Sequence, residues 1–142
     1  MKITISHEDI QTMALFEKMA KTVVVDYYKN TEDGDELIFV VKCRSLSDVV
    51  GPQGKRIKEI QSRFGRDIKV FKYSSEIKEF AENVLPVPLK SFEISEKGGK
   101  KTVKISVEQK DKSLAIGRGG KTIKNAATLL KRIFGIEDLK LL

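Results

Sequence analysis

One pattern occurs twice in this chain, first as Asp48-Val-Val-Gly-Pro-Gln-Gly-Lys-Arg-Ile57 and again as Leu114-Ala-Ile-Gly-Arg-Gly-Gly-Lys-Thr-Ile123. Two glycines, a lysine and an isoleucine recur in it, so that Gly51, Gly54, Lys55 and Ile57 match Gly117, Gly120, Lys121 and Ile123. Two glycines three positions apart, between an aliphatic pair and a lysine, predict a tight turn from one helix into the next. A phosphate can approach the backbone of such a turn closely.

The repeat predicts two similar units in a chain of 142 residues. A chain of this length holds one ordinary domain or two very small ones, and an internal repeat favours the second arrangement. We place the units at residues 1–73 and 74–142. Because small units bury little surface alone, we expect these two to pack together.

Hydrophobic periodicity and turn residues predict the same order of elements in both units, α-β-β-α-α-β, and hence an α+β fold. In the first unit, Ser6 and Asp9 resemble a capping box that opens a helix. The elements expected there are a helix at 7–20, strands at 22–28 and 36–44 around a turn at 30–35, a short helix at 46–50, a helix at 55–64 and a strand at 68–71. Those of the second unit are a helix at 76–84, strands at 89–94 and 101–107 joined at Gly98-Gly99, a short helix at 112–116, a helix at 121–134 and a strand at 136–141.

The formal net charge of +7 indicates an acidic partner, with nucleic acid first and an acidic membrane surface second. Most of the excess Lys and Arg lies in the later part of the chain, whereas the first third is acidic or balanced. No run of about 18 apolar residues and no signal-like segment after Met1 is present, so we expect a cytoplasmic protein without a membrane partner. The single cysteine, Cys43, excludes an intrachain disulfide and a Cys-based metal site.

Each repeated loop is predicted to end where a helix begins. The first N–H groups of a helix have no intrahelical partner, and the helix dipole favours negative charge there. Arg118 adds a fork of donors to the second loop, whereas Pro52 stiffens the first, so we expect the second loop to hold phosphate more strongly. The residues predicted to bind nucleic acid are Val50, Gly51, Pro52, Gln53, Gly54, Lys55, Arg56, Ile57 and Lys58, with Ile116, Gly117, Arg118, Gly119, Gly120, Lys121, Thr122, Ile123 and Lys124.

Aliphatic residues flank both loops, among them Val49, Val50 and Ile57 in the first copy. Some of these side chains must be core. We expect others to line a narrow apolar groove that accepts unstacked bases but excludes a duplex, which favours a single-stranded ligand.

The segments Val49–Ile57 and Ala115–Ile123 resemble the GXXG signature of KH domains, and the helix and hairpin before each resemble the type II arrangement. Two such units in one short chain resemble the archaeal NusA family of transcription factors over nearly the whole chain. In KH domains the GXXG loop clamps the backbone of a few single-stranded nucleotides. The resemblance therefore implies single-stranded RNA as the ligand of both loops, and RNA polymerase or a transcription complex as a candidate partner in elongation, termination or antitermination.

Two other roles use the same surface. Type II KH domains also occur in ribosomal proteins and ribosome-biogenesis GTPases, so a role in ribosome assembly or translation remains an alternative. The other alternative is an adaptor in which one KH unit binds protein instead of RNA. Both loops keep their glycines, which argues against the adaptor.

Catalytic chemistry finds little support in the sequence. Gly120-Lys121-Thr122 has the ending of an NTPase phosphate-binding loop, but only one helix and one strand are expected after it. His7 is the only histidine, and Cys43 lies within an apolar strand, where a buried inert thiol is the simpler interpretation. The acidic residues Glu32, Asp33, Asp35 and Glu36 are interpreted as a charged hairpin tip. We therefore predict no enzyme activity, no cofactor and no metal site.

Overall fold

The computed structural model describes residues 6–31 and 35–142. The chain divides into two compact units, Met1–Tyr73 and Ser74–Leu142, and each unit combines a three-stranded sheet with helices. The mixed α+β class predicted from the sequence is confirmed. The two units are described separately below.

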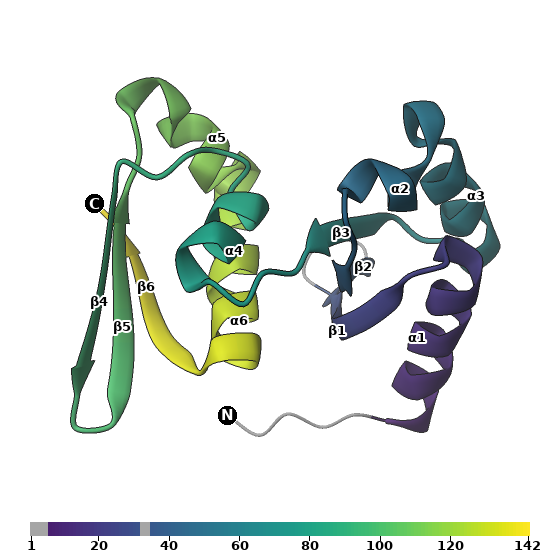
Figure 1. Ribbon diagram of the computed structural model, residues 1–142, viewed down its shortest axis with the longest axis horizontal. Helices are drawn as coiled ribbons and strands as arrows, with labels where there is room; N and C mark the ends of the chain where they lie inside the picture. Colours follow the sequence, from purple (N-terminus) through teal and green to yellow (C-terminus); the bar gives the residue numbers. More distant parts are fainter. Residues whose placement is uncertain (1–5, 32–34) are drawn as a thin grey trace. The chain divides into compact units, whose positions relative to one another are not determined.

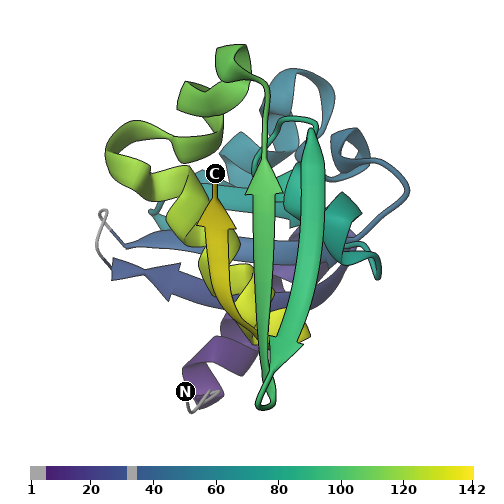
Figure 2. The same cartoon turned by 90° about the vertical axis from the view of Figure 1, so that its left-hand side faces the viewer.

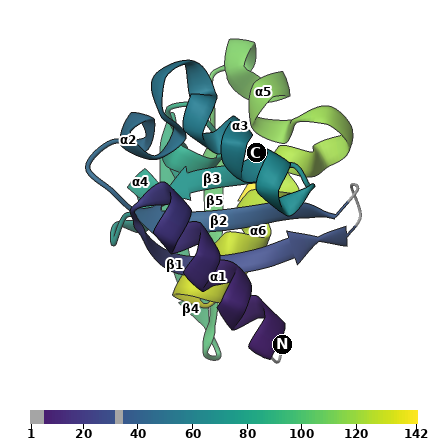
Figure 3. The same ribbon diagram turned by 90° about the vertical axis from the view of Figure 1, so that its right-hand side faces the viewer.

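The first unit places its helices on one face of a small mixed sheet (Figure 3). Strands β1 (Val23–Asn30) and β2 (Glu36–Lys42) are antiparallel, and β3 (Ile68–Lys72) joins β2 in parallel. Helix α1 (His7–Ala20) precedes the sheet, and its capping box between Ser6 and Asp9 is formed as predicted. The connection from β2 to β3 consists of α2 (Leu46–Val50), the 3-10 turn η2 (Pro52–Gly54) and α3 (Lys55–Phe64).

An aromatic stack joins helix and sheet in the first unit. Phe16 of α1 stacks on Phe39 of β2 with ring centroids 3.9 Å apart and planes 12° apart, and Tyr27 lies 4.8 Å from Phe39. Contacts of this kind contribute roughly 0.5–1.5 kcal/mol beyond the area that they bury. The buried side chains of this core are Phe16, Ala20, Tyr27, Leu37, Phe39, Val41, Val49, Ile60 and Ile68. Val49 lies two residues before Gly51, so this core anchors the start of the first glycine loop.

The second unit repeats the order of the first (Figure 1). Its sheet has the order β4-β5-β6, with β4 and β5 antiparallel and β6 parallel to β5. Its elements are α4 (Ile77–Val84), β4 (Ser91–Lys97), β5 (Lys100–Ser106), η3 (Gln109–Asp111), α5 (Lys112–Ile116), η4 (Arg118–Gly120), α6 (Lys121–Phe134) and β6 (Ile136–Leu141). Figure 2 shows α4 and α6 behind this sheet, and Phe80 of α4 lies 5.6 Å from Phe134 of α6 between ring centroids.

The predicted elements exist, and the differences are at strand ends. The hairpin β4–β5 extends to Lys97 and Lys100, farther than predicted, because Gly98 and Gly99 both have positive φ and form its two-residue turn. Strand β4 begins at Ser91 instead of the predicted residue 89. Strand β2 ends at Lys42, two residues early, and β1 continues to Asn30. Residues 32–34 of the predicted turn, which include Gly34 and two of the four acidic residues of the hairpin tip, lie outside the described residues.

One hydrogen bond recurs at the start of both hairpins. Oε2 of Glu17 in α1 accepts from the backbone N–H of Val24 at 2.8 Å. In the second unit, Oε2 of Glu82 in α4 accepts from the backbone N–H of Leu89, two residues before β4, at 2.7 Å. In each case a carboxylate on the opening helix binds the backbone near the start of the first strand.

Candidate nucleic-acid interface

The two glycine loops adopt the same backbone conformation. Gly51 has φ 78° and ψ 172°, and Gly117 has φ 77° and ψ 172°. Gly54 and Gly120, which immediately precede α3 and α6, have φ 72° and 78°. Each turn is closed by a backbone bond, from Gly54 N–H to Gly51 O at 3.0 Å and from Gly120 N–H to Gly117 O at 3.1 Å. The repeat in the sequence is therefore a repeat in backbone geometry.

The first glycine of each loop is required by the protein's own backbone. A Cβ built on Gly51 would lie 3.0 Å from the backbone N of Arg56 and 3.0 Å from its Cβ. A Cβ on Gly117 would lie 2.3 Å from Oγ1 of Thr122 and 2.8 Å from its backbone N. Both glycines also occupy a backbone region that is essentially restricted to glycine. These glycines therefore leave space for the helix that follows the loop.

The third residue of the loop is glutamine in the first copy and glycine in the second, but its conformation is the same. Gln53 has φ 55° and Gly119 has φ 62°, so both are left-handed. Glycine adopts this conformation at no steric cost, whereas glutamine does not. The second residue between the two glycines must therefore be left-handed, which restricts the residue types that fit there.

Both loops end at the N-terminus of a helix, as predicted. The N-cap residues of α3 and α6 are Gly54 and Gly120, which have no side chain that could cap the first turn. The positive ends of these two helix dipoles therefore remain available to an anion. This arrangement can bind a phosphate without any metal.

The predicted basic residues lie in different environments. Lys55 and Lys58 of α3 and Lys124 of α6 are exposed, as is Arg118 in the second loop. Arg56 is half-buried, and its Nη1 donates to the backbone carbonyl of Asp48 at 2.6 Å. The Arg56 side chain thus braces α2 against α3, a role that the sequence did not indicate.

The predicted aliphatic residues divide between core and surface. Val49 and Ala115 are buried, with exposed fractions of 2% and 0%. The side chains that remain half-buried are Val50, Ile57, Ile116 and Ile123. Ile57 packs against the first core, and its Cγ2 would lie 3.8 Å from a Cβ at Gly54. Part of its surface therefore faces the loop, where a base could contact it.

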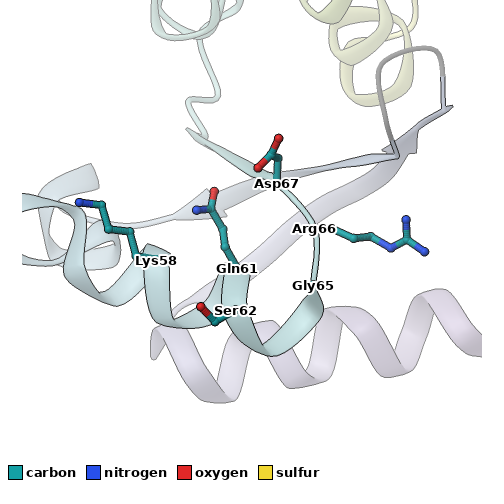
Figure 4. Close-up of a pocket in the computed structure, with 6 residues that line it drawn as sticks. All are labelled: Lys58, Gln61, Ser62, Gly65, Arg66 and Asp67. Atoms are coloured by element: carbon teal, nitrogen blue, oxygen red, sulfur yellow. The ribbon is translucent and has the colours of Figure 1, made fainter.

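Two shallow depressions lie along the exposed face of α3. The one beside the first loop has a volume of about 490 Å³ and is lined by Pro52, Gln53, Lys55, Lys58, Glu59 and Ser62. The other, of about 550 Å³, is lined by Lys58, Gln61, Ser62, Gly65, Arg66 and Asp67 (Figure 4). Sequence reasoning missed Glu59 and Ser62, although their helical spacing from Lys55 places them on the same face.

At the far end of α3, the polar side chains are already engaged in structural contacts. In Figure 4 the Arg66 side chain points away from those of Lys58 and Gln61, and its Nη1 lies 2.9 Å from Oδ2 of Asp35. Oε1 of Gln61 accepts from the backbone N–H of Ile68 at 3.1 Å. We therefore place the candidate interface at the loop end of α3.

The described residues offer no support for a reactive thiol, a metal site or a membrane-spanning helix. Cys43 was expected to be buried within a strand, but it lies one residue beyond the end of β2 and is half-buried. Its partial burial raises the pKa of the thiol, which keeps it protonated at neutral pH. Tyr27 and Phe39, two aromatic residues of the first sheet, are buried in the first core and do not offer their rings to a ligand. Within residues 6–31 and 35–142, no group of three or more His, Cys, Asp or Glu side chains could hold a metal ion. In the same part of the chain, no helix is both long enough and apolar enough to span a bilayer.

Comparison with known proteins identifies relatives along the whole chain. A probable transcription termination protein NusA from Methanococcus vannielii is 30% identical over 141 residues, which cover 99% of this chain and 80% of the relative. The protein of the same name from Halococcus morrhuae is 31% identical over 143 residues, which cover 99% of each chain. No protein-family model matches the chain.

A solved structure agrees with the fold over nearly all residues. The crystal structure of APE1850 is similar with a TM-score of 0.87 and 30% sequence identity, and the match covers 97% of this chain and 100% of that one. The match to the Halococcus protein spans both glycine loops and almost all of both sequences. The two archaeal relatives share 30% and 31% of residues with this chain along almost its whole length. The chain therefore belongs to the archaeal NusA family of probable transcription termination proteins.

Proposed function

We propose that this protein binds single-stranded RNA through two type II KH units and acts, without catalysing a reaction, in transcription termination or antitermination. The single observation that carries this proposal is the matched geometry of the two loops. Gly51–Gly54 and Gly117–Gly120 have the same backbone angles, and each leads directly into a helix N-terminus. The order α-β-β-α-α-β of each unit is that of type II KH domains.

The chemistry of the loops favours a phosphate backbone. Helix dipoles and basic side chains converge at the loops, from Lys55 and Lys58 on α3 and from Arg118 and Lys124 around the second loop. The half-buried aliphatic residues beside each loop offer surface to bases. Bases are accessible to such side chains only when they are unpaired, which supports a single-stranded ligand.

Two loops in one chain strengthen binding through local concentration. When one loop holds a strand, the other encounters the same strand at an effective concentration that depends on the connecting chain. Two weak contacts can then give a useful affinity. The relatives named as transcription termination proteins suggest that this strand is a transcript and that RNA polymerase or a transcription complex is nearby.

The first test is a competition binding experiment with labelled single-stranded RNA. Duplex RNA and single-stranded DNA serve as competitors over a salt series. The variants replace Pro52-Gln53 or Arg118-Gly119 with Asp-Asp, and the controls replace the same pairs with Ser-Ser. No described atom lies within 4 Å of a Cβ built on Gly119, and Asp tolerates left-handed φ, so we expect the fold to persist.

We expect the Asp-Asp changes to weaken RNA binding roughly tenfold or more for each loop, because two carboxylates repel the phosphate, while Ser-Ser has a smaller effect. Circular dichroism checks that each variant is folded. Equal binding of all three polymers, with no dependence on either loop, would show a generic polyanion surface and contradict the proposed function.

A further inference from the structure

The two loops share a backbone but not a chemical environment. Counted over matched stretches, residues 48–59 contain three basic residues and two acidic ones, Asp48 and Glu59. Residues 114–125 contain three basic residues and no acidic one. Since the loop angles agree within a few degrees, this difference lies in the side chains alone.

Position 48 in the first unit corresponds to position 114 in the second, and the contrast is sharpest there. Asp48 is an exposed carboxylate on α2, three residues before Gly51. Leu114 takes the same place on α5 before Gly117, and 57% of its surface is exposed. The next residue, Ala115, is fully buried, so α5 turns its core face inward and leaves Leu114 outside. Residues three apart on a helix share a face, which places Leu114 beside the start of the loop.

The side chain that packs near the loop from the following helix also differs between the units. In the first unit, Nη1 of Arg56 is bound to the carbonyl of Asp48. The residue that corresponds to Arg56 in the second unit is Thr122, whose Oγ1 lies against Gly117. The second unit therefore packs a short neutral side chain against its loop where the first unit has Arg56. Of the three basic residues within residues 114–125, Arg118 and Lys124 are exposed, and Lys121 is half-buried.

We propose that positions 48 and 114 make the two RNA contacts unequal: Leu114 packs on an unpaired base at the second loop, and the Asp48 carboxylate weakens the hold of the first loop on phosphate. This inference rests on the proposed function and specifies how it is divided between the units. The second unit supplies the larger share of affinity, with an apolar part that salt does not screen. The first unit supplies a weaker contact that depends on salt.

The test measures each loop separately in the full chain. Leu114→Asn is made in a background in which Pro52-Gln53 is Asp-Asp, so that the second loop binds alone. Asp48→Asn is made in a background in which Arg118-Gly119 is Asp-Asp. The matched control is Ile94→Asn in the background that carries Leu114→Asn, since Ile94 is another exposed apolar residue, at 45%, on strand β4 of the same unit. Titrations use labelled single-stranded RNA at several salt concentrations.

We expect Leu114→Asn to weaken binding roughly three- to tenfold with an unchanged salt slope, because it removes apolar contact but no charge. Ile94→Asn should have no effect. Asp48→Asn should strengthen binding by the first loop roughly two- to fivefold at low salt, and the gain should shrink as salt rises.

The outcomes separate this inference from the function on which it rests. If RNA binding depends on both loops but Leu114→Asn equals the Ile94→Asn control, or if Asp48→Asn leaves the first loop unchanged, the inference is wrong and the proposed function stands. If the unaltered protein does not bind single-stranded RNA, both are wrong. A loss at Leu114→Asn that disappears at high salt would also overturn the inference, because an apolar contact is not screened.

Discussion

Gly51 and Gly117 lie where the chain passes within contact distance of the helix that follows the loop. Their backbone angles are nearly forbidden to other residues, and the atoms that a Cβ would meet include main-chain nitrogens of Arg56 and Thr122. Backbone atoms cannot rotate away as the end of a side chain can. The close approach therefore holds each loop in a strained shape that leads directly into a helix N-terminus.

Gly117→Ala should therefore destabilise the second unit strongly. We expect a loss of roughly 2–4 kcal/mol in the free energy of unfolding, from the strained φ and from the clash with Thr122. Gly119→Ala is the matched control, because Gly119 is also left-handed but no described atom lies within 4 Å of its added Cβ. It should cost only about 1 kcal/mol. Urea unfolding measures both, and equal losses would contradict the role of the close approach.

The sequence predicted the loop residues better than their individual roles. The spacing of Gly51 and Gly54 predicted the turn, since few other residues allow it. It could not show that Arg56 donates to the Asp48 carbonyl, because that bond depends on how α2 packs against α3. The exposure of Leu114 was equally hidden, since an apolar residue in a short helix is more often core.

At the scale of elements, the two hairpins begin at the same kind of contact. Glu17 accepts from Val24 N–H and Glu82 accepts from Leu89 N–H, each seven residues along the chain and partly buried. A carboxylate that accepts from a backbone amide gives a stronger bond than a neutral group does. These two bonds connect the opening helix of each unit to its sheet.

Glu17→Ala and Glu82→Ala should each lower the free energy of unfolding by roughly 1–3 kcal/mol, because a partly buried N–H loses its acceptor. Replacement by Gln keeps an acceptor oxygen and should recover much of the loss. Glu8→Ala on α1 is the control, since Glu8 is exposed. Thermal unfolding of the two Ala and Gln pairs and of the Glu8→Ala control checks this, and a Gln variant as unstable as the Ala variant would contradict it.

Helices and hairpins were predictable because their signals are local. The capping box at Ser6 and Asp9, the glycines that end α3 and α6, and the Gly98-Gly99 turn all act over a few residues. Strand ends were less predictable. Strand β4 begins at Ser91, two residues after Leu89, although the β-type residues of the sequence begin earlier. The extent of a strand depends on pairing with a distant partner strand, which no local pattern shows.

At the scale of the whole molecule, charge is distributed unevenly between the two units. Residues 74–142 contain 14 Lys and Arg against 9 Asp and Glu, whereas residues 1–73 contain 13 against 11. The second unit is the more basic, and it also has the loop without a neighbouring carboxylate. A polyanion should therefore encounter the second unit first and then reach the first unit as an intramolecular partner.

The most direct test of the central claim is an amide chemical-shift titration of the isotope-labelled full chain with single-stranded RNA. We predict that the largest changes occur at Gly51–Arg56 and at Gly117–Thr122, that the second set responds at lower RNA concentration, and that duplex RNA produces neither. Changes concentrated on the basic hairpin Lys97–Lys104, with both loops unmoved, would contradict the account.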